Sequence, residues 1–355
     1  MHVDYLIIGQ GISGTWLSYY LQKEGISFLV IDDNAPHSSS RIAAGIINPV
    51  TGRRHVTVWM ADEILPFAAT AYKEIGFELD IAAISQKTII DFFPSPQMRE
   101  SFLQRVDENS PYVHSYPEQN HFNHFLNYDF GCGEIRPVYI AQLDTLLPAW
   151  QKQLRQKQLL LEEKFNIDAL RMEARGISYH DITARKIIFC DGSSSAQWPF
   201  FNLLPFAPNK GEMLLVDIPD LPPHNIYKKG MMVVPLTTPG LFWVGSNYAW
   251  EFDHMDPTKE FRLRTEQFLR EWLKIPFTVI EHLAGIRPAT LERRPFIGIH
   301  PTKPAIGILN GMGTKGCSLA PFFAHQFVGH LLHGKTLNPE ADVNRFRKIL
   351  SRNIS

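Results

Sequence analysis

The sequence has little cysteine, no excess of charge of either sign and no long hydrophobic run. Its three cysteines, Cys132, Cys190 and Cys317, are far apart and form no CxxC pair, which argues against a disulfide framework or a zinc site and fits a reducing compartment. The 35 Lys and Arg balance the 36 Asp and Glu, so nothing favours a nucleic acid as partner. No apolar run has membrane-spanning length, and the first residues lack a secretory signal. We therefore expect a cytoplasmic protein without a transmembrane segment.

The chain is long enough for two domains, and its apolar pattern is interleaved rather than divided at one point. Of its 355 residues, 45% are hydrophobic and 12% aromatic, which fits a globular protein with a substantial core. Residues 86–130 and 210–248 alternate polar with apolar residues between prolines and glycines, a pattern typical of strands and loops. Apolar periodicity predicts helices over residues 12–23, 62–75, 138–156, 257–274 and 318–333.

The first 33 residues carry the strongest motif of the chain. An apolar run over 3–8 leads into a glycine turn and a helix, and a second apolar run ends at Asp32 and Asp33. Strand, glycine turn, helix, strand and acid form the fingerprint of a dinucleotide-binding βαβ unit. We predict that a nucleotide diphosphate binds at the helix N-terminus and that the acids hold its ribose. The alternative is an ordinary glycine turn. The predicted turn residues are Gly9, Gln10, Gly11, Ile12, Ser13 and Gly14.

A second glycine-rich loop opens a second helix late in the chain. A strand-like run over 305–309 leads to the loop 311–316. The helix that follows has Pro321 in its first turn and Gly334 just past its end. Residues 284–288, which read Ala-Gly-Ile-Arg-Pro, come shortly before. An NAD-binding dehydrogenase that used only the N-terminal fingerprint would need neither segment.

Four segments make the chain resemble the FAD-dependent D-amino acid oxidase family, which includes glycine and sarcosine oxidases. They are 8–14 with Asp32, 38–45, 284–288, and 311–316 with Pro321. The resemblance implies an α/β fold, α+β overall, in which a Rossmann-like FAD-binding domain is interleaved with an antiparallel-sheet substrate domain. The FAD-binding domain is expected from residues 1–85, 131–200 and 275–355, and the substrate domain from 86–130 and 201–274.

The resemblance also implies where FAD is held. In the family, a helix N-terminus stabilises the negative charge of the reduced flavin ring. That position falls on Gly311, Met312, Gly313, Thr314, Lys315 and Gly316. Lys315 either adds a positive charge there or is a surface loop lysine. The phosphate-side candidates are Ser40 and Arg41, and the ring-side candidates are Ala44, Gly45 and Ile46. The alternative for this segment is a polar turn followed by a buried strand of small residues. Weaker matches are Phe165, Cys190 and Gly192.

Arg287 is the expected substrate residue and also lies in a cofactor-binding segment. In the family, the arginine of this context holds the substrate carboxylate through two charge-assisted hydrogen bonds; the alternative is a structural ion pair. Tyr248 matches a position that faces substrate, with a core tyrosine as the alternative. Met232 stands where several relatives carry an aromatic residue, which puts their substrate range in doubt here.

Three further groups are ambiguous. His114, His121 and His124 lack cysteine or clear carboxylate partners, so we expect no metal. Cys317 follows the glycine loop near which some sarcosine oxidases tether FAD, but a small buried residue at a helix start is the favoured alternative, and we expect non-covalent FAD. Residues 53–55, Arg-Arg-His, either contact an anionic ligand or form a solvated turn.

These observations predict an FAD-dependent oxidoreductase that acts on an amine or amino acid. Hydride passes from the substrate Cα to flavin N5, and the resulting imine hydrolyses. The partner is a small molecule; oxygen, a quinone and a protein all stay open as electron acceptor. The alternatives are a flavin-dependent biosynthetic or tRNA-base-modifying oxidase, an NAD-dependent dehydrogenase and a non-enzymatic flavoprotein.

Overall fold

The computed structural model describes residues 1–352 and places the N-terminal motif at the centre of a mainly parallel sheet. Strand β1 (His2–Ile8) leads through the glycine turn into helix α1 (Ile12–Lys23), and β2 (Phe28–Ile31) returns parallel to β1. The strand order is β9-β2-β1-β12-β19-β18, and the hairpin β10–β11 pairs beside the first half of β12. The remaining strands are β9 (Leu160–Leu161), β10 (Leu170–Glu173), β11 (Gly176–Tyr179), β12 (Ile182–Phe189), β18 (Phe296–His300) and β19 (Lys303–Asn310).

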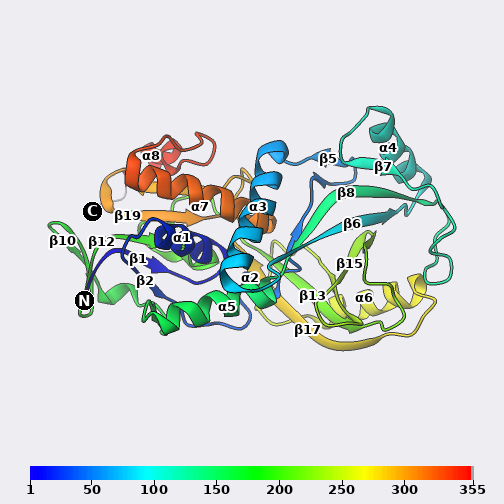
Figure 1. Ribbon diagram of the computed structural model, residues 1–355, viewed down its shortest axis with the longest axis horizontal. Coiled ribbons are helices and arrows are strands. Elements are labelled where there is room, and N and C mark those ends of the chain that lie inside the picture. The colour runs from blue at the N-terminus through cyan, green and yellow to red at the C-terminus, as the bar shows by residue number, and fades with distance from the viewer. Residues whose placement is uncertain (353–355) are drawn as a thin grey trace.

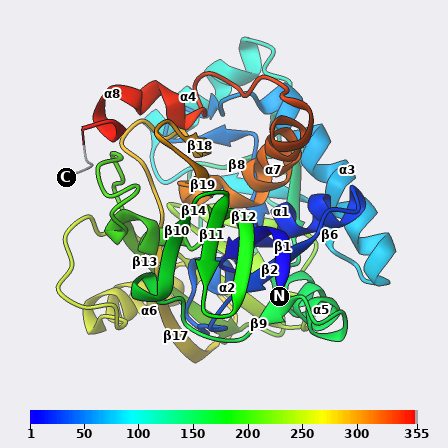
Figure 2. The same cartoon turned by 90° about the vertical axis from the view of Figure 1, so that its left-hand side faces the viewer.

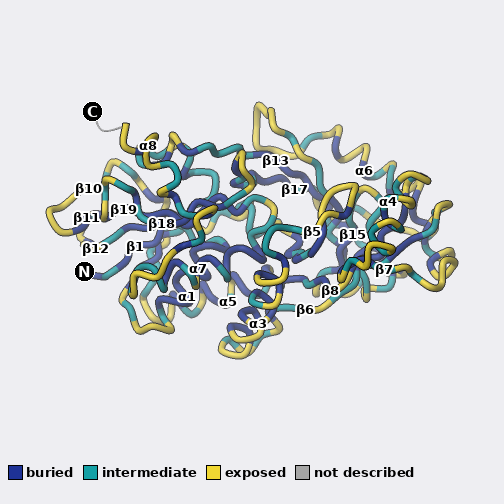
Figure 3. The backbone as a smooth tube through the Cα atoms, turned by 90° about the horizontal axis from the view of Figure 1, so that it is seen from above, coloured by how far each residue is buried: buried dark blue, intermediate teal, exposed yellow. Residues whose placement is uncertain are grey.

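The parallel sheet is buried on both faces, which explains its continuous apolar strands. In β1, Tyr5 and Ile7 belong to one core cluster, whereas Leu6 and Ile8 belong to a second cluster on the opposite face. This alternation follows from the two-residue period of a strand. The backbone trace coloured by burial shows these strands as dark, buried segments (Figure 3).

Four long helices share the first of these clusters. They are α1, α3 (Ala61–Leu79), α5 (Leu143–Gln156) and α7 (Gly316–His333). Trp16 of α1 meets Tyr72 of α3 edge to face, with ring centroids 5.0 Å apart, and Trp150 of α5 donates from its indole N–H to Ser18 Oγ at 2.8 Å. The helices α1 and α7 lie beside one another over the sheet (Figure 2). This packing aims the N-termini of both helices at the same region.

The second sheet is mainly antiparallel and lies at the other end of the elongated molecule (Figure 1). Its order is β17-β13-β16-β15-β14-β6-β8-β3, with β7 beside β8, and β14 pairs parallel with β6. Its strands are β3 (Ile46–Ile47), β6 (Ile84–Phe92), β7 (Val113–Ser115), β8 (Cys132–Ala141), β13 (Asn209–Asp217), β14 (Ile226–Lys229), β15 (Met231–Pro235), β16 (Leu241–Gly245) and β17 (Thr278–Arg287). Helix α6 (Lys259–Trp272) packs on one face through Phe261 and Leu269.

Shorter elements join the two sheets. The strands β4 (Val50–Thr51) and β5 (Val56–Thr57) form a small hairpin, and α2 (Ser39–Ile42) precedes β3. The Trp243 indole N–H donates to the carbonyl of Ile42 at 2.9 Å, which ties the antiparallel sheet to the segment after β2. Helix α8 (Arg347–Leu350) and four 3-10 turns, among them Gly313–Lys315, complete residues 1–352. No helix in this range has the length and apolar character to cross a membrane.

The predicted architecture of a Rossmann-like parallel sheet interleaved with an antiparallel sheet is confirmed, and two local predictions are wrong. The helix expected over 138–156 begins only at Leu143, because Val138 and Ile140 are buried in β8 and paired with β6 and β3. The range 86–130, expected as strands and loops, contains helix α4 (Pro96–Asp107), which begins after Ser95, whose hydroxyl accepts from the Met98 N–H at 3.3 Å.

The predicted domain ranges stay a prediction. The pairing of the strands nevertheless shows that β8 and β17 lie in the antiparallel sheet, although residues 131–200 and 275–355 were assigned to the FAD-binding domain. The chain therefore passes between the two sheets more often than two insertions require.

Candidate active site

One cavity of about 1370 Å³ reaches from the glycine turn of the parallel sheet to the face of the antiparallel sheet. Most predicted site residues line it. They are Gly9, Gly11, Ile12, Ser13, Asp32, Asp33, Ser40, Arg41, Ala44, Gly45, Ile46, Phe165, Cys190, Gly192, Tyr248, Arg287, Met312, Gly313, Thr314, Lys315 and Gly316. Gln10, Gly14 and Gly311 are absent from the lining and lie behind the cavity wall.

The N-terminal glycine turn fits an anionic diphosphate. Gly9 has φ +96°, and a Cβ there would lie 2.8 Å from the carbonyl oxygen of Cys190. A Cβ on Gly14 would lie 1.8 Å from the carbonyl oxygen of Gly9, so Gly14 sets how closely α1 approaches β1. Helix α1 has no side-chain cap at Gly11, and the Ile12 N–H donates to Ser40 Oγ at 3.0 Å. The Ile12 amide is thus occupied, whereas the Ser13 amide has no hydrogen bond among the described residues and lies beside the cavity, where the helix dipole favours negative charge.

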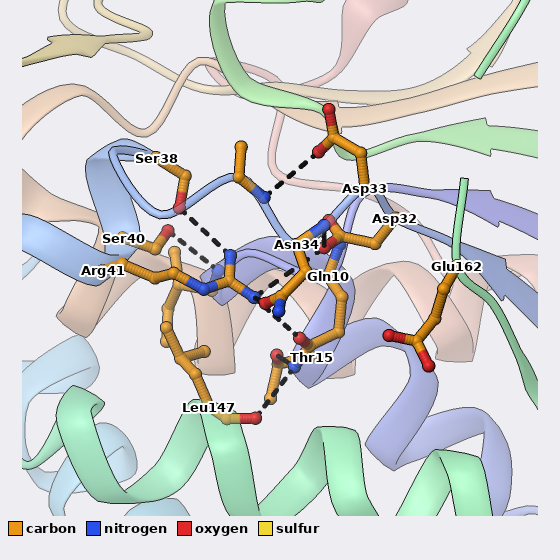
Figure 4. A network of polar contacts seen from close by, with 12 residues as sticks. Gln10, Thr15, Asp32, Asp33, Asn34, Ser38, Ser40, Arg41, Leu147 and Glu162 are labelled. Carbon is orange, nitrogen blue, oxygen red and sulfur yellow. Dashed lines mark hydrogen bonds and ion pairs between the residues drawn. The ribbon is translucent and has the colours of Figure 1, made fainter. Parts of the chain in front are cut away.

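Asp32 is held by backbone and arginine contacts at the edge of this turn (Figure 4). Its Oδ2 accepts from the Gln10 N–H at 2.7 Å, and its Oδ1 lies 3.7 Å from Arg41 Nη2. Arg41 also donates to Asn34 Oδ1 at 2.7 Å. The side-chain amide nitrogen of Gln10 donates to Thr15 and to the carbonyl of Leu147, while its Oε1 accepts from Arg41 Nη2 at 3.4 Å, so Gln10 supports Asp32 through its backbone and Arg41 through its side chain.

The second glycine loop brings the N-terminus of α7 to the same cavity. Gly311 has φ +76°, and a Cβ there would lie 2.8 Å from Thr290 Cγ2, so that residue is fixed by packing. Helix α7 begins at Gly316 without a side-chain cap. Lys315 lines the cavity, and its Nζ lies 3.4 Å from the carbonyl oxygen of Asn48. Lys315 is half-buried, so it is not a fully solvated lysine of a surface loop, and burial lowers the pKa of its ammonium group to about 8.

Gly45 and Gly192 adopt conformations that favour glycine, for different reasons. Gly45 has φ +73°, and a Cβ would lie 2.0 Å from the carbonyl oxygen of Ala141; the close approach of β8 therefore requires it. Gly192 has φ +62° with open space around it. Beside it, burial raises the pKa of the Asp191 carboxyl to about 6, against the opposing hydrogen bonds from Ser195 and Trp198.

Arg287 presents an uncompensated guanidinium to the cavity. Its Nη1 donates to Asn209 Oδ1 at 2.7 Å and to the carbonyl of Asn247 at 3.1 Å, while Nη2 donates to Ser246 Oγ at 2.7 Å. Gly211 leaves room for it, since a Cβ there would lie 1.8 Å from Arg287 Nη2. All three partners are neutral, and Arg287 forms no ion pair among the described residues, so its charge is available to a ligand. Burial lowers its pKa from the ordinary value.

Tyr248 covers this arginine from the solvent side. The Arg287 Cζ lies 4.7 Å from the centroid of the Tyr248 ring, and the tyrosine is 57% exposed. A cation within about 6 Å of a ring centroid makes a cation–π contact. Tyr248 is therefore not a core residue.

Comparison with known proteins identifies the family of this chain. The family model described as FAD dependent oxidoreductase (DAO) matches residues 4–328. The chain belongs to this family. Its cofactor is accordingly FAD, and the uncapped α1 terminus with its neighbouring glycines is where this chain would hold the diphosphate.

Solved structures of other oxidoreductases share the fold at low sequence identity. Iminodiacetate oxidase from Chelativorans sp. BNC1 is 19% identical with a TM-score of 0.75, covering 95% of this chain and 97% of that one. L-Proline dehydrogenase from P. horikoshii is 16% identical with a TM-score of 0.78, covering 98% of each. Glycine oxidase from Bacillus cereus is 16% identical with a TM-score of 0.76, covering 95% and 96%. These similarities establish the fold and leave the substrate open.

One curated relative matches a short segment only. The uncharacterized oxidoreductase YurR of Bacillus subtilis is 32% identical over 77 residues. The match spans 22% of this chain and 20% of that relative.

The remaining predicted residues lie at the edges of the cofactor region. Phe165 stacks on Tyr179 with centroids 5.2 Å apart, so its ring packs in the core beside the cavity. Cys317 is buried, and burial raises the pKa of its thiol to about 12. His121 Nδ1 lies 3.2 Å from Glu118 Oε2, and no group of three or more potential metal ligands gathers within residues 1–352.

The three residues of the segment 53–55 have different surroundings in the structure, and His55 belongs to a polar cluster that was not predicted from the sequence. Arg53 lines the cavity, whereas Arg54 is exposed outside it. His55 is buried and its Nε2 lies 2.7 Å from Asp91 Oδ2, which also accepts from Lys228 Nζ at 2.7 Å. Asp91 and Lys228 both line the cavity. The sequence feature that could have indicated this cluster is the carboxylate of Asp91 within the mainly apolar run 88–93.

Proposed function

We propose that this FAD-dependent oxidoreductase oxidises an amino acid or a related amine that carries a carboxylate. The observation that carries the proposal is the uncompensated Arg287 guanidinium in the same cavity as the two glycine loops. A buried cation with neutral partners favours an anionic ligand, because the ligand supplies the charge that the protein lacks. The amino acid and imino acid substrates named for the structural neighbours support this choice.

The chain's own residues would bind and orient the substrate. Three of the five Arg287 N–H donors hold the guanidinium in place through Asn209, Asn247 and Ser246. The remaining two, on Nε and Nη2, can fix a carboxylate in one plane. Tyr248 narrows the entrance and limits water at this end. FAD, when bound, supplies the two-electron acceptor for the carbon–hydrogen bond next to the amine. The substrate leaves as an imine, which water hydrolyses. Fixing the orientation is the main catalytic contribution of this protein.

The deciding experiment is anaerobic flavin reduction screened over D- and L-amino acids, N-methyl amino acids and simple amines. We expect bleaching by a subset of the carboxylate-bearing compounds. Replacing Arg287 with alanine should raise KM for those compounds about 100-fold, because charge-assisted hydrogen bonds contribute roughly 1.5–3 kcal/mol each.

Arg293→Ala is the matched control, since Arg293 is close in sequence but does not line the cavity. Absence of bleaching by every compound, or unchanged kinetics in Arg287→Ala, contradicts the proposal.

A further inference from the structure

The cavity has a second set of charged side chains, at the end away from the glycine turns. Asp91 Oδ2 accepts from both Lys228 Nζ and His55 Nε2, each at 2.7 Å. The side chains of His55 and Asp91 are 1% and 4% exposed, and that of Lys228 is 18% exposed. Burial opposes ionisation of Asp91 and is the largest single effect, yet Lys228 and His55 together hold the pKa of this carboxyl below its usual value.

Strand register places this cluster on the same sheet face as the arginine subsite. Consecutive pairings run Met213–Gly245, Gly245–Met232, Met232–Lys228 and Lys228–Asp91. Directly paired residues point to one face of a sheet, and all five line the cavity. They form its floor.

The floor has a defined length. The Arg287 guanidinium lies over Gly211 of β13, where a Cβ would lie 1.8 Å from Nη2, and three strand spacings separate β13 from β14, which carries Lys228, about 14 Å at about 4.8 Å each. Beyond Asp91 the row is blocked. Its next partner is Gly133, where Phe102 occupies the space so closely that a Cβ would lie 2.1 Å from its ring.

Two cations at this closed end, Lys228 and Arg53, have N–H donors without an acceptor among the described residues. Lys228 Nζ makes one hydrogen bond among residues 1–352, to Asp91, and so keeps two donors for a ligand. Arg53 is exposed on the β4–β5 turn, lines the cavity and has no hydrogen bond or ion pair in the described part of the chain. With Lys228 and Arg53 positive and Asp91 negative, these three groups carry a net charge of about +1.

We propose that the floor's closed end is a second anion subsite and that the substrate is an amino acid whose side chain ends in a carboxylate. The inference rests on the proposed function, with the α-carboxylate at Arg287. The distal carboxylate accepts from Lys228 Nζ and from the Arg53 guanidinium. Because about 14 Å separates the strands that carry the two subsites, side chains longer than that of glutamate fit best.

The test uses non-reactive ligands, so that binding is measured without turnover. FAD-loaded protein is titrated with glutarate, adipate, pimelate and suberate and with the monocarboxylates of equal carbon number, followed by the visible absorption of the flavin. We expect each longer dicarboxylate to bind at least about tenfold more tightly than its monocarboxylate, since one added charge-assisted contact of about 1.4 kcal/mol gives that factor.

Two variants locate the effect. Lys228→Met and Arg53→Gln should each reduce the dicarboxylate advantage at least threefold, whereas Arg54→Gln, with the same charge change outside the cavity, should keep it. If Lys228→Met fails to fold because Asp91 loses its cation, the exposed Arg53→Gln still decides. Equal affinity for the two ligand series, or an advantage unchanged in Arg53→Gln and in any folded Lys228 variant, overturns the subsite.

Substrate oxidation separates this inference from the proposed function. Anaerobic flavin reduction is compared for 2-aminoadipate, norleucine and lysine, whose side chains end in an acid, a methyl group and an amine. Reduction fastest with 2-aminoadipate supports the inference, and reduction fastest with lysine or norleucine overturns it. If no amino acid reduces the flavin but the dicarboxylate advantage is present, the anion subsite is supported and the proposed function fails.

Discussion

The two ends of the cavity are built by different means. At the parallel sheet, backbone conformation makes the site: glycines at positions 9, 11 and 14 and the uncapped starts of α1 and α7. At the antiparallel sheet, side chains make it: Arg287, Lys228 and Asp91 converge from strands far apart in the chain. The first kind of site depends on space, and the second depends on charge and register. Substitutions should therefore impair different properties at the two ends: packing and cofactor binding at the first, and ligand binding at the second.

The largest effect is expected at the cofactor end. Gly14→Ala places a methyl group 1.8 Å from the carbonyl oxygen of Gly9, which forces α1 away from β1. We expect a loss of about 3 kcal/mol in the free energy of unfolding, together with loss of bound flavin. Urea denaturation and the ratio of flavin to protein absorbance measure both.

A methyl group in α7 serves as the control for that change. At Gly329 the nearest atom to a new Cβ is in the flexible Lys335 side chain, at 3.1 Å. Gly329→Ala should keep its flavin and remain within about 1 kcal/mol of the parent. A Gly14→Ala protein with a full complement of flavin would show that α1 packs differently.

A substitution at the substrate end should weaken substrate binding and leave FAD bound. Gly211→Ala places a Cβ 1.8 Å from Arg287 Nη2 and displaces the guanidinium. We expect normal flavin content and a KM raised on the order of 30-fold for carboxylate substrates, since about 2 kcal/mol of charge-assisted binding is lost.

A double variant checks the cause. Once Arg287→Ala has removed the guanidinium, Gly211→Ala should have little further effect on KM, because the two changes act through one contact. Additive effects would mean that Gly211 acts through another contact.

A moderate effect of pH is expected at Asp191, beside the cofactor end. Its pKa is raised by burial to about 6, so the folded state binds the proton more tightly than the unfolded state. The stabilisation from the protonated form is complete below the ordinary pKa near 4 and is lost as pH rises through 6. The parent should gain about 1 kcal/mol from pH 7 to pH 5 relative to Asp191→Asn, measured by urea denaturation of FAD-saturated protein. Parallel pH profiles for the two proteins would contradict this.

The smallest effect is expected at the entrance. In Tyr248→Phe the ring still covers Arg287, so KM should change less than twofold. Tyr248→Ala loses the ring contact of about 0.5–1 kcal/mol at an exposed site, and KM should rise about two- to fivefold. Steady-state kinetics of the two variants compare the hydroxyl with the ring. A larger loss in Tyr248→Phe would assign the hydroxyl a direct contact with substrate.

The same contrast explains what the sequence could predict. The glycine turns depend on local contacts, because the atoms that each glycine packs against belong to the same motif or to the adjoining strand. The parallel sheet and the FAD region were accordingly predictable, whereas the role of Arg287 came from the family resemblance and stays a prediction. Lys228 and Asp91 become neighbours only through the parallel pairing of β14 with β6, which no local pattern encodes. Ser95 and Pro96 are typical of a helix N-terminus and mark the start of α4. The strand-like residues around them nevertheless favoured a prediction of strands and loops.

The position of β19 has a consequence for how the protein is made. Strand β12 pairs with β19 through Ile187–Ile306 and its neighbours, more than a hundred residues apart, and α7 follows β19 directly. A ribosome therefore completes nearly the whole polypeptide before both glycine loops can meet. Partly synthesised chains expose the uncovered edge of β12, an aggregation-prone state.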